Sequence, residues 1–245
     1  MSTTALPEES EAALTESQRL LYTFTAPAKT MADLRRNASW WVPWLLVSIV
    51  SVGFAYTLDK KIGWAQAIET QIQANPKAAA QIEQQAPEQR EKDLKIKAAV
   101  AGVISYAAPL VTLLTIVVMA GLGLVMFNFG FGAKLRFGEL MGVAAYSQLP
   151  SILYYLLIIA VMFLVAPDAF DMNDPIATNV GYFIPHTMPL LKTVLGALDV
   201  FMLWQVFLLA VGISQLSNVK KGKAFAAIFA LFFLFKLAGA VFIGM

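Results

Sequence analysis

The sequence predicts an all-α membrane protein with five transmembrane helices, and three observations support this fold class. Of its 245 residues, 58% are hydrophobic and 14% are charged, which is unlike the composition of a soluble domain. Most charges gather in short segments between long uncharged runs. Five of these runs have a length near or above the ~20 residues that cross the hydrocarbon core of a bilayer. The predicted spans are about 40–58, 98–129, 137–165, 190–216 and 224–243.

The composition also excludes several classes of function. The formal net charge of +2 gives no reason to expect a nucleic-acid partner. The chain has no cysteine, which excludes disulfides and cysteine metal sites, and its single histidine, His186, excludes a histidine-rich centre. Asp168, Asp171 and Asp174 lack the glycine and distal glutamate of a calcium-binding loop. We therefore expect no metal and no cofactor.

No catalytic motif is recognisable in the sequence. It lacks a Ser-His-Asp order, an HExxH pair, a phosphate-binding loop and a paired-carboxylate site. The opening residues MSTTALPEES have no basic stretch ahead of an apolar core, so we do not expect a cleaved signal peptide. The sequence thus predicts a protein that is not an enzyme.

The chain divides into a polar N-terminal tail, residues 1–24, and a membrane domain, residues 25–245. Thr25 followed by Pro27 is typical of a helix start, with threonine as the N-cap and proline in the first turn. The helix predicted over 26–38 is amphipathic, which suits a helix lying in the membrane interface. An ordinary lead-in helix packed on the bundle explains the same pattern equally well.

The first span is followed by a long polar insertion, residues 59–97. Pro76 and Pro87 are each expected in the first turn of a helix, so the insertion should form two or three short helices outside the membrane. We favour a solvated hairpin over a dedicated binding module. Three tryptophans mark the membrane interface where the first span begins, because indole rings favour the headgroup region: Trp40, Trp41 and Trp44.

Spans two and three contain helix-breaking prolines. Pro109 is expected to bend span two. Pro150 lies in a polar patch at the middle of span three and frees a backbone carbonyl that neighbouring groups must satisfy. We interpret the patch as interhelical hydrogen bonding around a kink, and a substrate-lining cavity is the alternative. Its members are Tyr146, Ser147, Gln148, Pro150 and Ser151, with amide groups added by Asn128 and Gln205.

The fourth and fifth runs each carry one charged residue far from their ends, Asp199 and Lys236. The short link 217–223 makes the two runs antiparallel neighbours, and a rise of 1.5 Å per residue then places both charges at a similar depth. Because an unpaired charge at depth is costly, partners are expected. We favour a buried ion pair that fixes the register of the two helices. A proton or ion relay, or a polar pocket for a lipid headgroup, is the alternative.

Loop charges predict the orientation. Short ends and loops on one side are basic, whereas the loop after span three has no Lys or Arg before Lys192. The positive-inside rule therefore places the N-terminus in the cytoplasm and the C-terminus outside, in the cytoplasmic membrane if the source is prokaryotic. The lysine-rich insertion 59–97 argues the other way, but longer translocated segments often disregard the rule. The basic residues are Lys29, Arg35, Arg36, Lys134, Arg136, Lys220, Lys221 and Lys223.

Taken together, these features resemble the Yip1 domain family. The resemblance covers roughly 24–243 and is carried by Phe24-x-x-Pro27, by Ala145-Tyr146-Ser147-Gln148-Leu149-Pro150, and by Leu198-Asp199-Val200-Phe201-Met202-Leu203-Trp204 followed by Leu209-Ala210-Val211-Gly212-Ile213. It implies a five-span domain with a cytoplasmic N-terminus and an outward C-terminus. Eukaryotic members are associated with vesicle trafficking and prenylated GTPases. This chain lacks their Asp-Leu-Tyr-Gly-Pro motif and looks more like prokaryotic members, so GTPase binding is not carried over.

These sequence features and the resemblance lead to two hypotheses for the function. The leading one is a non-enzymatic scaffold or membrane-organising protein whose helix 26–38 presses on the cytoplasmic leaflet. Its expected partners are the lipid bilayer and an unidentified membrane protein, and a homo-oligomer is compatible with the sequence. The alternative is a small transporter or lipid-translocating protein that uses the polar residues of spans three to five.

Overall fold

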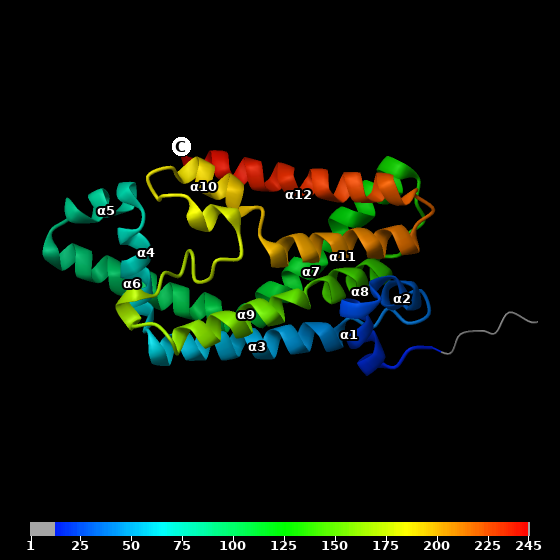
Figure 1. Cartoon of the computed structure of the whole chain (residues 1–245), viewed down its shortest axis with the longest axis horizontal. Helices are drawn as coiled ribbons and strands as arrows, with labels where there is room; N and C mark the ends of the chain where they lie inside the picture. Colours follow the sequence, from blue (N-terminus) through cyan, green and yellow to red (C-terminus); the bar gives the residue numbers. More distant parts are fainter. Residues whose placement is uncertain (1–12, 245) are drawn as a thin grey trace, which may run out of the picture.

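A computed structural model of the chain describes residues 13–244, apart from the side chains of residues 76, 77, 189 and 240–244. Within this part of the chain the regular elements are helices, which form an elongated bundle (Figure 1). The α-helices are α1 (Glu16–Thr25), α2 (Pro27–Asp33), α3 (Trp41–Lys61), α4 (Trp64–Gln73), α5 (Pro76–Glu83), α6 (Pro87–Tyr106), α7 (Ala108–Leu124), α8 (Phe137–Ser147), α9 (Pro150–Met162), α10 (Pro189–Gly196), α11 (Val200–Leu216) and α12 (Lys221–Gly244).

Four stretches of the described chain are long and apolar enough to cross a membrane: Trp41–Lys61, Ala108–Phe129, Phe137–Met162 and Lys221–Gly239. The second of these continues α7 through a π-helical turn, and the third joins α8 to α9. Helix α11 is also apolar but has 17 residues. At 1.5 Å per residue it measures roughly 26 Å, slightly less than the hydrocarbon core. The all-helical, membrane-spanning fold class is thus confirmed.

Two predicted spans have different boundaries in the structure. The candidate span predicted over 98–129 begins at Ala108, because α6 ends at Tyr106 and Pro109 starts a new helix. The run predicted over 190–216 is not continuous. It is broken into α10 and α11, and the three residues between them include the C-cap of one helix and the N-cap of the next. The expectation that Asp199 lies within a helix is therefore wrong.

Residue 26 separates two short helices, and α2 ends at Asp33, whereas the helix predicted there continued to residue 38. Thr25 is the last residue of α1, where its hydroxyl donates to the Leu21 carbonyl at 3.1 Å, and Ala26 takes the N-cap position of α2. The predicted threonine cap is therefore wrong. Met31 and Leu34 have no exposed surface, because they belong to the hydrophobic core with α8 and α11 residues. This apolar face is used for protein packing, as the lead-in interpretation expects.

Buried charges join α1 to α2, and a hydrogen bond joins α1 to α8. The Arg19 guanidinium is 2% exposed and pairs with the Asp33 carboxylate at 2.7 Å and with Glu16 at 3.2 Å. The Tyr146 hydroxyl of α8 donates to Glu16 at 2.7 Å. Burial lowers the pKa of Arg19, but the hydrogen bond and charge of Asp33 outweigh burial, so its pKa lies above the ordinary value. Part of the predicted tail 1–24 is thus packed structure, while residues 1–12 lie outside the description.

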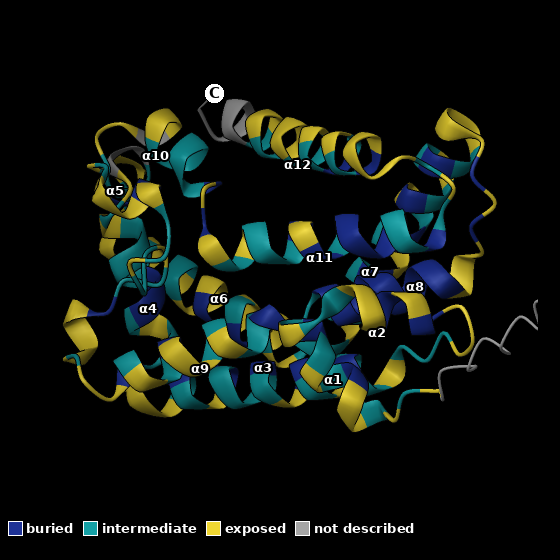
Figure 2. Ribbon diagram, turned by 45° about the vertical axis from the view of Figure 1, so that its right-hand side comes forward, coloured by how far each residue is buried: buried dark blue, intermediate teal, exposed yellow. Residues whose placement is uncertain are grey.

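The insertion 59–97 forms α4, α5 and the first half of α6, and it projects beyond the bundle at one end (Figure 1). Helices α5 and α6 begin at Pro76 and Pro87, which confirms both predicted starts. Helices α4 and α6 pack closely where the insertion joins the bundle. A Cβ added at Gly102 of α6 would lie 3.3 Å from the Trp64 ring of α4. Much of its surface is exposed, whereas α8 is buried over most of its length (Figure 2).

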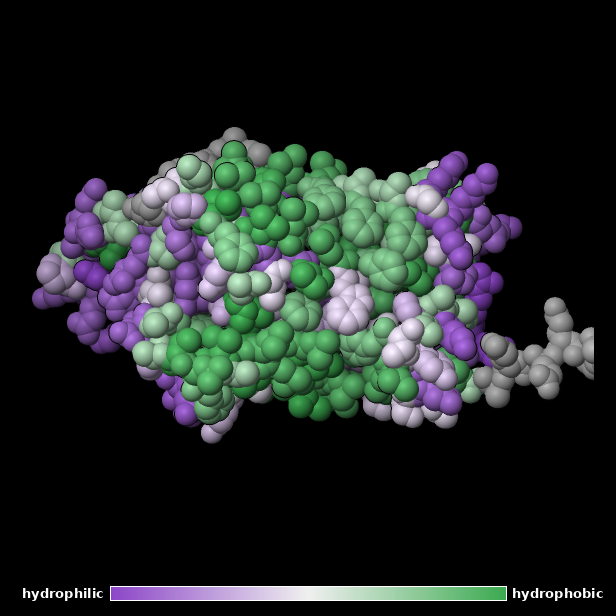
Figure 3. All heavy atoms as spheres, viewed as in Figure 1, coloured by the Kyte–Doolittle hydropathy of each residue, from purple (hydrophilic) through white to green (hydrophobic). Residues whose placement is uncertain are grey.

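The bundle has two distinct ends. Helices α1 and α2, the turn before α8 and the turn between α11 and α12 share one end, while the insertion and the segment 163–188 share the other (Figure 1). Helix α12 ends on the insertion side, opposite α1. A hydrophobic band separates polar atoms at the two ends (Figure 3). The basic residues counted for the positive-inside rule therefore lie at the α1 end.

The buried charges of α1 and α2 predict a stability effect. Replacing Arg19 with Ala leaves the Asp33 carboxylate buried without its partner, so Arg19→Ala should destabilise the protein by about 3–5 kcal/mol. The double variant Arg19→Met, Asp33→Leu should lose much less, because no buried charge is left without its partner; the Glu16 side chain, which also pairs with Arg19, is 36% exposed. Thermal unfolding in detergent measures both. Equal losses in the two variants would show that the cost of Arg19→Ala does not come from an unpaired Asp33 carboxylate.

Candidate functional site

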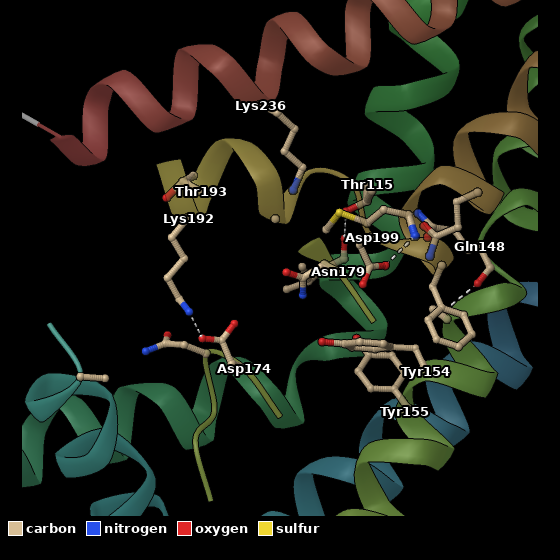
Figure 4. Close-up of a pocket in the computed structure, with 18 of the residues that line it drawn as sticks. Thr115, Gln148, Tyr154, Tyr155, Asp174, Asn179, Lys192, Thr193, Asp199 and Lys236 are labelled. Carbon is tan, nitrogen blue, oxygen red and sulfur yellow. Dashed lines mark hydrogen bonds and ion pairs between the residues drawn. The ribbon is translucent and has the colours of Figure 1, made fainter. Parts of the chain in front are cut away.

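The candidate site is a cavity of about 910 Å³ within the bundle. It lies between α9, α11, α12, the start of α7 and the segment 173–187 that folds back toward them (Figure 4). Its walls are rich in hydroxyl, amide and charged groups. The polar lining residues are Asn75, Thr112, Thr115, Gln148, Ser151, Tyr154, Tyr155, Asn173, Asp174, Asn179, His186, Thr187, Lys192, Thr193, Asp199, Gln205 and Lys236.

Asp199 is positioned by the break between α10 and α11. Its extended backbone makes it the N-cap of α11, and its Oδ1 accepts the Met202 N–H at 2.9 Å. Its Oδ2 accepts the Thr178 hydroxyl at 2.5 Å. An isolated β-bridge to Asn179 holds the same segment. Negative charge is favoured at a helix N-terminus, so this carboxylate is compensated although it is 7% exposed.

The segment before α10 forms the wall of the cavity at the insertion end. The Lys192 ammonium pairs with Asp174 Oδ2 at 2.5 Å and donates to the carbonyls of Gly181 and Ile184 at 3.3 and 3.1 Å. The His186 imidazole lies 3.6 Å from Asp171 and 3.8 Å from Asp174. This His-Asp-Asp cluster has the spacing of a metal site, but the Lys192 charge on the Asp174 carboxylate disfavours a second cation there.

Lys236 reaches the cavity from α12. Its side chain extends from the helix toward the space between α10 and α11 (Figure 4). The predicted pair with Asp199 is not formed at ion-pair distance: in the described part of the chain no carboxylate lies within 4.0 Å of this ammonium. The ammonium lies 5.9 Å from the centre of the Phe232 ring on the same helix. Both charges do line one cavity, so the two residues share a site without touching.

The predicted polar patch is divided between the cavity and the protein interior. Gln148 and Ser151 line the cavity, as does Gln205. Tyr146 and Ser147 are buried and bond elsewhere, Tyr146 to Glu16 and Ser147 to the Val143 carbonyl at 2.7 Å. Asn128 is remote and fixes the turn before α8 through two bonds to the Leu135 backbone. Pro150 begins α9, and the Ser151 hydroxyl donates to the Gln148 carbonyl at 2.6 Å. Part of the patch therefore lines the cavity, and part forms hydrogen bonds inside the protein.

The three tryptophans have different surroundings. Trp41 is 55% exposed, as expected of an interfacial anchor. Trp44 instead donates its indole N–H to the Pro109 carbonyl at 2.9 Å, and its ring packs edge-to-face on Trp40. Trp40 itself packs against the hydrophobic core. Two of the three predicted anchors thus also join α3 to the bundle.

Sequence reasoning missed the two tyrosines of the cavity. Tyr154 and Tyr155 extend from α9 into it, and neither hydroxyl has a hydrogen-bond partner among the described residues (Figure 4). Tyr154 packs edge-to-face on Phe201 of α11. The signal was present in the sequence, because Gln148, Ser151 and Tyr155 recur at intervals of three and four and so share one face of a helix.

This arrangement favours binding over catalysis. The lining groups offer donors and acceptors around the cavity. Among the described residues at the cavity, no hydroxyl is paired with a histidine or carboxylate base in the manner of an activated nucleophile, apart from the Thr178 contact that orients Asp199. Fold and site together define a helical integral membrane protein with a polar cavity inside its hydrophobic band.

The comparisons with known proteins identify the family. The model of the Yip1 domain matches residues 21–243, so the chain belongs to the Yip1 domain family, a family of membrane proteins that is not known as enzymatic. This confirms the resemblance found in the sequence. No curated protein and no solved structure matches the chain.

The cap predicts how the two charged residues contribute to stability. Asp199→Ala removes the acceptor of the Met202 N–H and should cost about 1–2 kcal/mol, whereas Asp199→Asn keeps an acceptor and should cost less. Lys236→Met should be close to neutral, because no described carboxylate is left unpaired. A buried ion pair would instead make Lys236→Met cost about 3–5 kcal/mol. Thermal unfolding of the four proteins in the same detergent distinguishes the two cases.

Proposed function

We propose that the protein spans the membrane five times and passes the polar part of an amphiphilic molecule through its cavity. The fifth span is α10 and α11 together, which supply the length that α11 alone lacks. The observation that carries the proposal is the location of a polar cavity in a hydrophobic bundle. Polar and charged side chains are costly at this depth, and in membrane proteins they commonly line the path of a substrate or ion.

The broken fourth span supports a transport function. Irregular backbone at membrane depth is tolerated where it is buried in protein or lines a water-filled cavity. Discontinuous helices of this kind form the substrate sites of many transporters. Here Asp199 lies at such a break, and both Asp199 and Gly196 line the cavity. A volume of about 910 Å³ lies within the usual range of small-molecule sites.

The surface supports a lateral route into the cavity. Polar atoms interrupt the hydrophobic band near its centre, between α12 and the side formed by α3 and α9 (Figure 3). Helix α12 packs on α10 and α11, and only 11% of the residues in its span are buried. A molecule with an apolar tail can then keep its tail in the bilayer while its polar part enters.

Loop charges support the proposed orientation. The basic residues before α3, before α8 and between α11 and α12 share one end of the bundle, and the positive-inside rule places that end in the cytoplasm. The N-terminus is then cytoplasmic and the end of α12 is outside. The cytoplasmic membrane of a prokaryotic cell is the corresponding location.

Blocking the cavity tests translocation. Thr115→Trp places an indole in the space, so we expect it to reduce transbilayer movement of a fluorescent phospholipid in proteoliposomes at least several-fold. Leu114→Trp is the matched control, since Leu114 is the preceding residue of α7 and is 63% exposed on the outer surface. Equal rates in the wild type, both variants and empty vesicles would refute the proposal.

A partner-binding scaffold is the second candidate function, and the projecting insertion favours it. Helices α5 and α6 extend an exposed, polar surface beyond the bundle, with ion pairs such as Lys95–Glu91 at its surface. The leaflet-pressing mechanism has less support, because α2 buries Met31 and Leu34 in protein.

Photo-crosslinking distinguishes the scaffold from a solvated hairpin. A photoreactive residue in place of Glu88 in native membranes should capture one protein reproducibly if the insertion binds a partner. The same residue in place of Leu114 is the control and should capture lipid. Capture of a scattered mixture at Glu88 would indicate a solvated hairpin.

A further inference from the structure

We infer that the cavity recognises a phosphate group through the ammonium of Lys236. The inference rests on the proposed function for the site and adds the chemical class of the ligand. It would make α12 the helix that selects the substrate. The charged groups that line the cavity differ in whether the described residues provide an ion-pair or hydrogen-bond partner for them.

The ammonium of Lys236 is the charged group of the cavity that has no hydrogen-bond or ion-pair partner among the described residues. It has three N–H donors. Among the described residues none of the hydrogen bonds or ion pairs involves it, and its cation–π contact with Phe232 is long at 5.9 Å. A lysine in the outer helix of a membrane bundle is costly without a partner. Figure 4 shows its side chain extending into the cavity and not out toward lipid.

The carboxylates that line the cavity are already compensated. Asp199 accepts the Met202 N–H and the Thr178 hydroxyl, so its charge is balanced by the start of α11. Asp174 is paired with Lys192 at 2.5 Å. Of the charged groups that the structure describes here, Lys236 is the one left to attract a ligand, and the ligand it attracts is an anion.

Neutral donors that line the same cavity as Lys236 favour an anion with several oxygens. The hydroxyls of Tyr154 and Tyr155 point into the cavity and have no described partner, and the Gln148 amide makes only a 3.9 Å contact with the Met119 sulfur. Phosphate offers strong acceptor oxygens to several such donors at once, and hydrogen bonds to a charged acceptor are about twice as strong as neutral ones. The lateral route favours a phosphate carried by a lipid, while a soluble phosphate ester has the same chemistry.

Photolabelling in maltoside micelles, which contain no phosphate, tests the inference. The probes are a diazirine phosphatidylglycerol and a diazirine diacylglycerol with the same acyl chains. We expect the phospholipid probe to label cavity-lining peptides far more than the diacylglycerol probe. Lys236→Met should weaken phospholipid binding by about ten- to a hundredfold, the usual cost of a hydrogen bond to a charged group. Lys236→Arg should retain most of the binding.

Lys223→Met is the matched control, because it removes a lysine from the exposed start of the same helix. It should leave labelling unchanged. Loss of phospholipid labelling on addition of millimolar glycerol phosphate would identify a soluble phosphate ester as the ligand, and no effect would identify the lipid. Equal labelling by both probes, or full labelling of Lys236→Met, overturns the inference. Phosphate-dependent labelling without translocation in vesicles would refute the transport function and leave this inference standing.

Discussion

The need to satisfy backbone groups at membrane depth governs this structure. A helix that ends inside an apolar layer leaves N–H and carbonyl groups that neither water nor lipid can satisfy. The break between α10 and α11 is stable because Asp199 caps the new helix and because Thr178 and Asn179 fold back to bond the same segment. The returning segment in turn keeps α12 apart from α9, and the polar cavity occupies the space between them.

A second set of buried polar groups organises the opposite end. Arg19, Asp33 and Glu16 join two short helices to Tyr146 of α8, so the residue most recognisable in the polar patch serves the N-terminal segment and not the cavity. Adjacent residues of one apolar span therefore contact different surroundings. Tyr146 and Ser147 face protein, whereas Gln148 and Ser151 face the cavity. The kink at Pro150 marks the change from one surrounding to the other.

Much of the fold was predictable because its signals are local. Apolar runs locate the membrane helices, and prolines locate the starts of α5, α6, α7 and α9. The break at residue 199 was not predictable from the apolar run, since a lone Asp199 in such a run also fits a buried ion pair and the groups that stabilise the break lie about twenty residues away in the chain. The amphipathic pattern around Met31 was ambiguous for a related reason, because an apolar face has the same sequence whether protein or lipid covers it.

Helix α12 also has a consequence for how the protein is made. Chains enter the membrane in order of synthesis, and α12 follows every other helix that lines the cavity. When Lys236 enters the bilayer, the tyrosines of α9 and the capped end of α11 can already be in place to receive its charge. The proposed ligand site would thus also accept a charged helix during insertion, so that membrane assembly and the proposed ligand recognition would depend on the same residues.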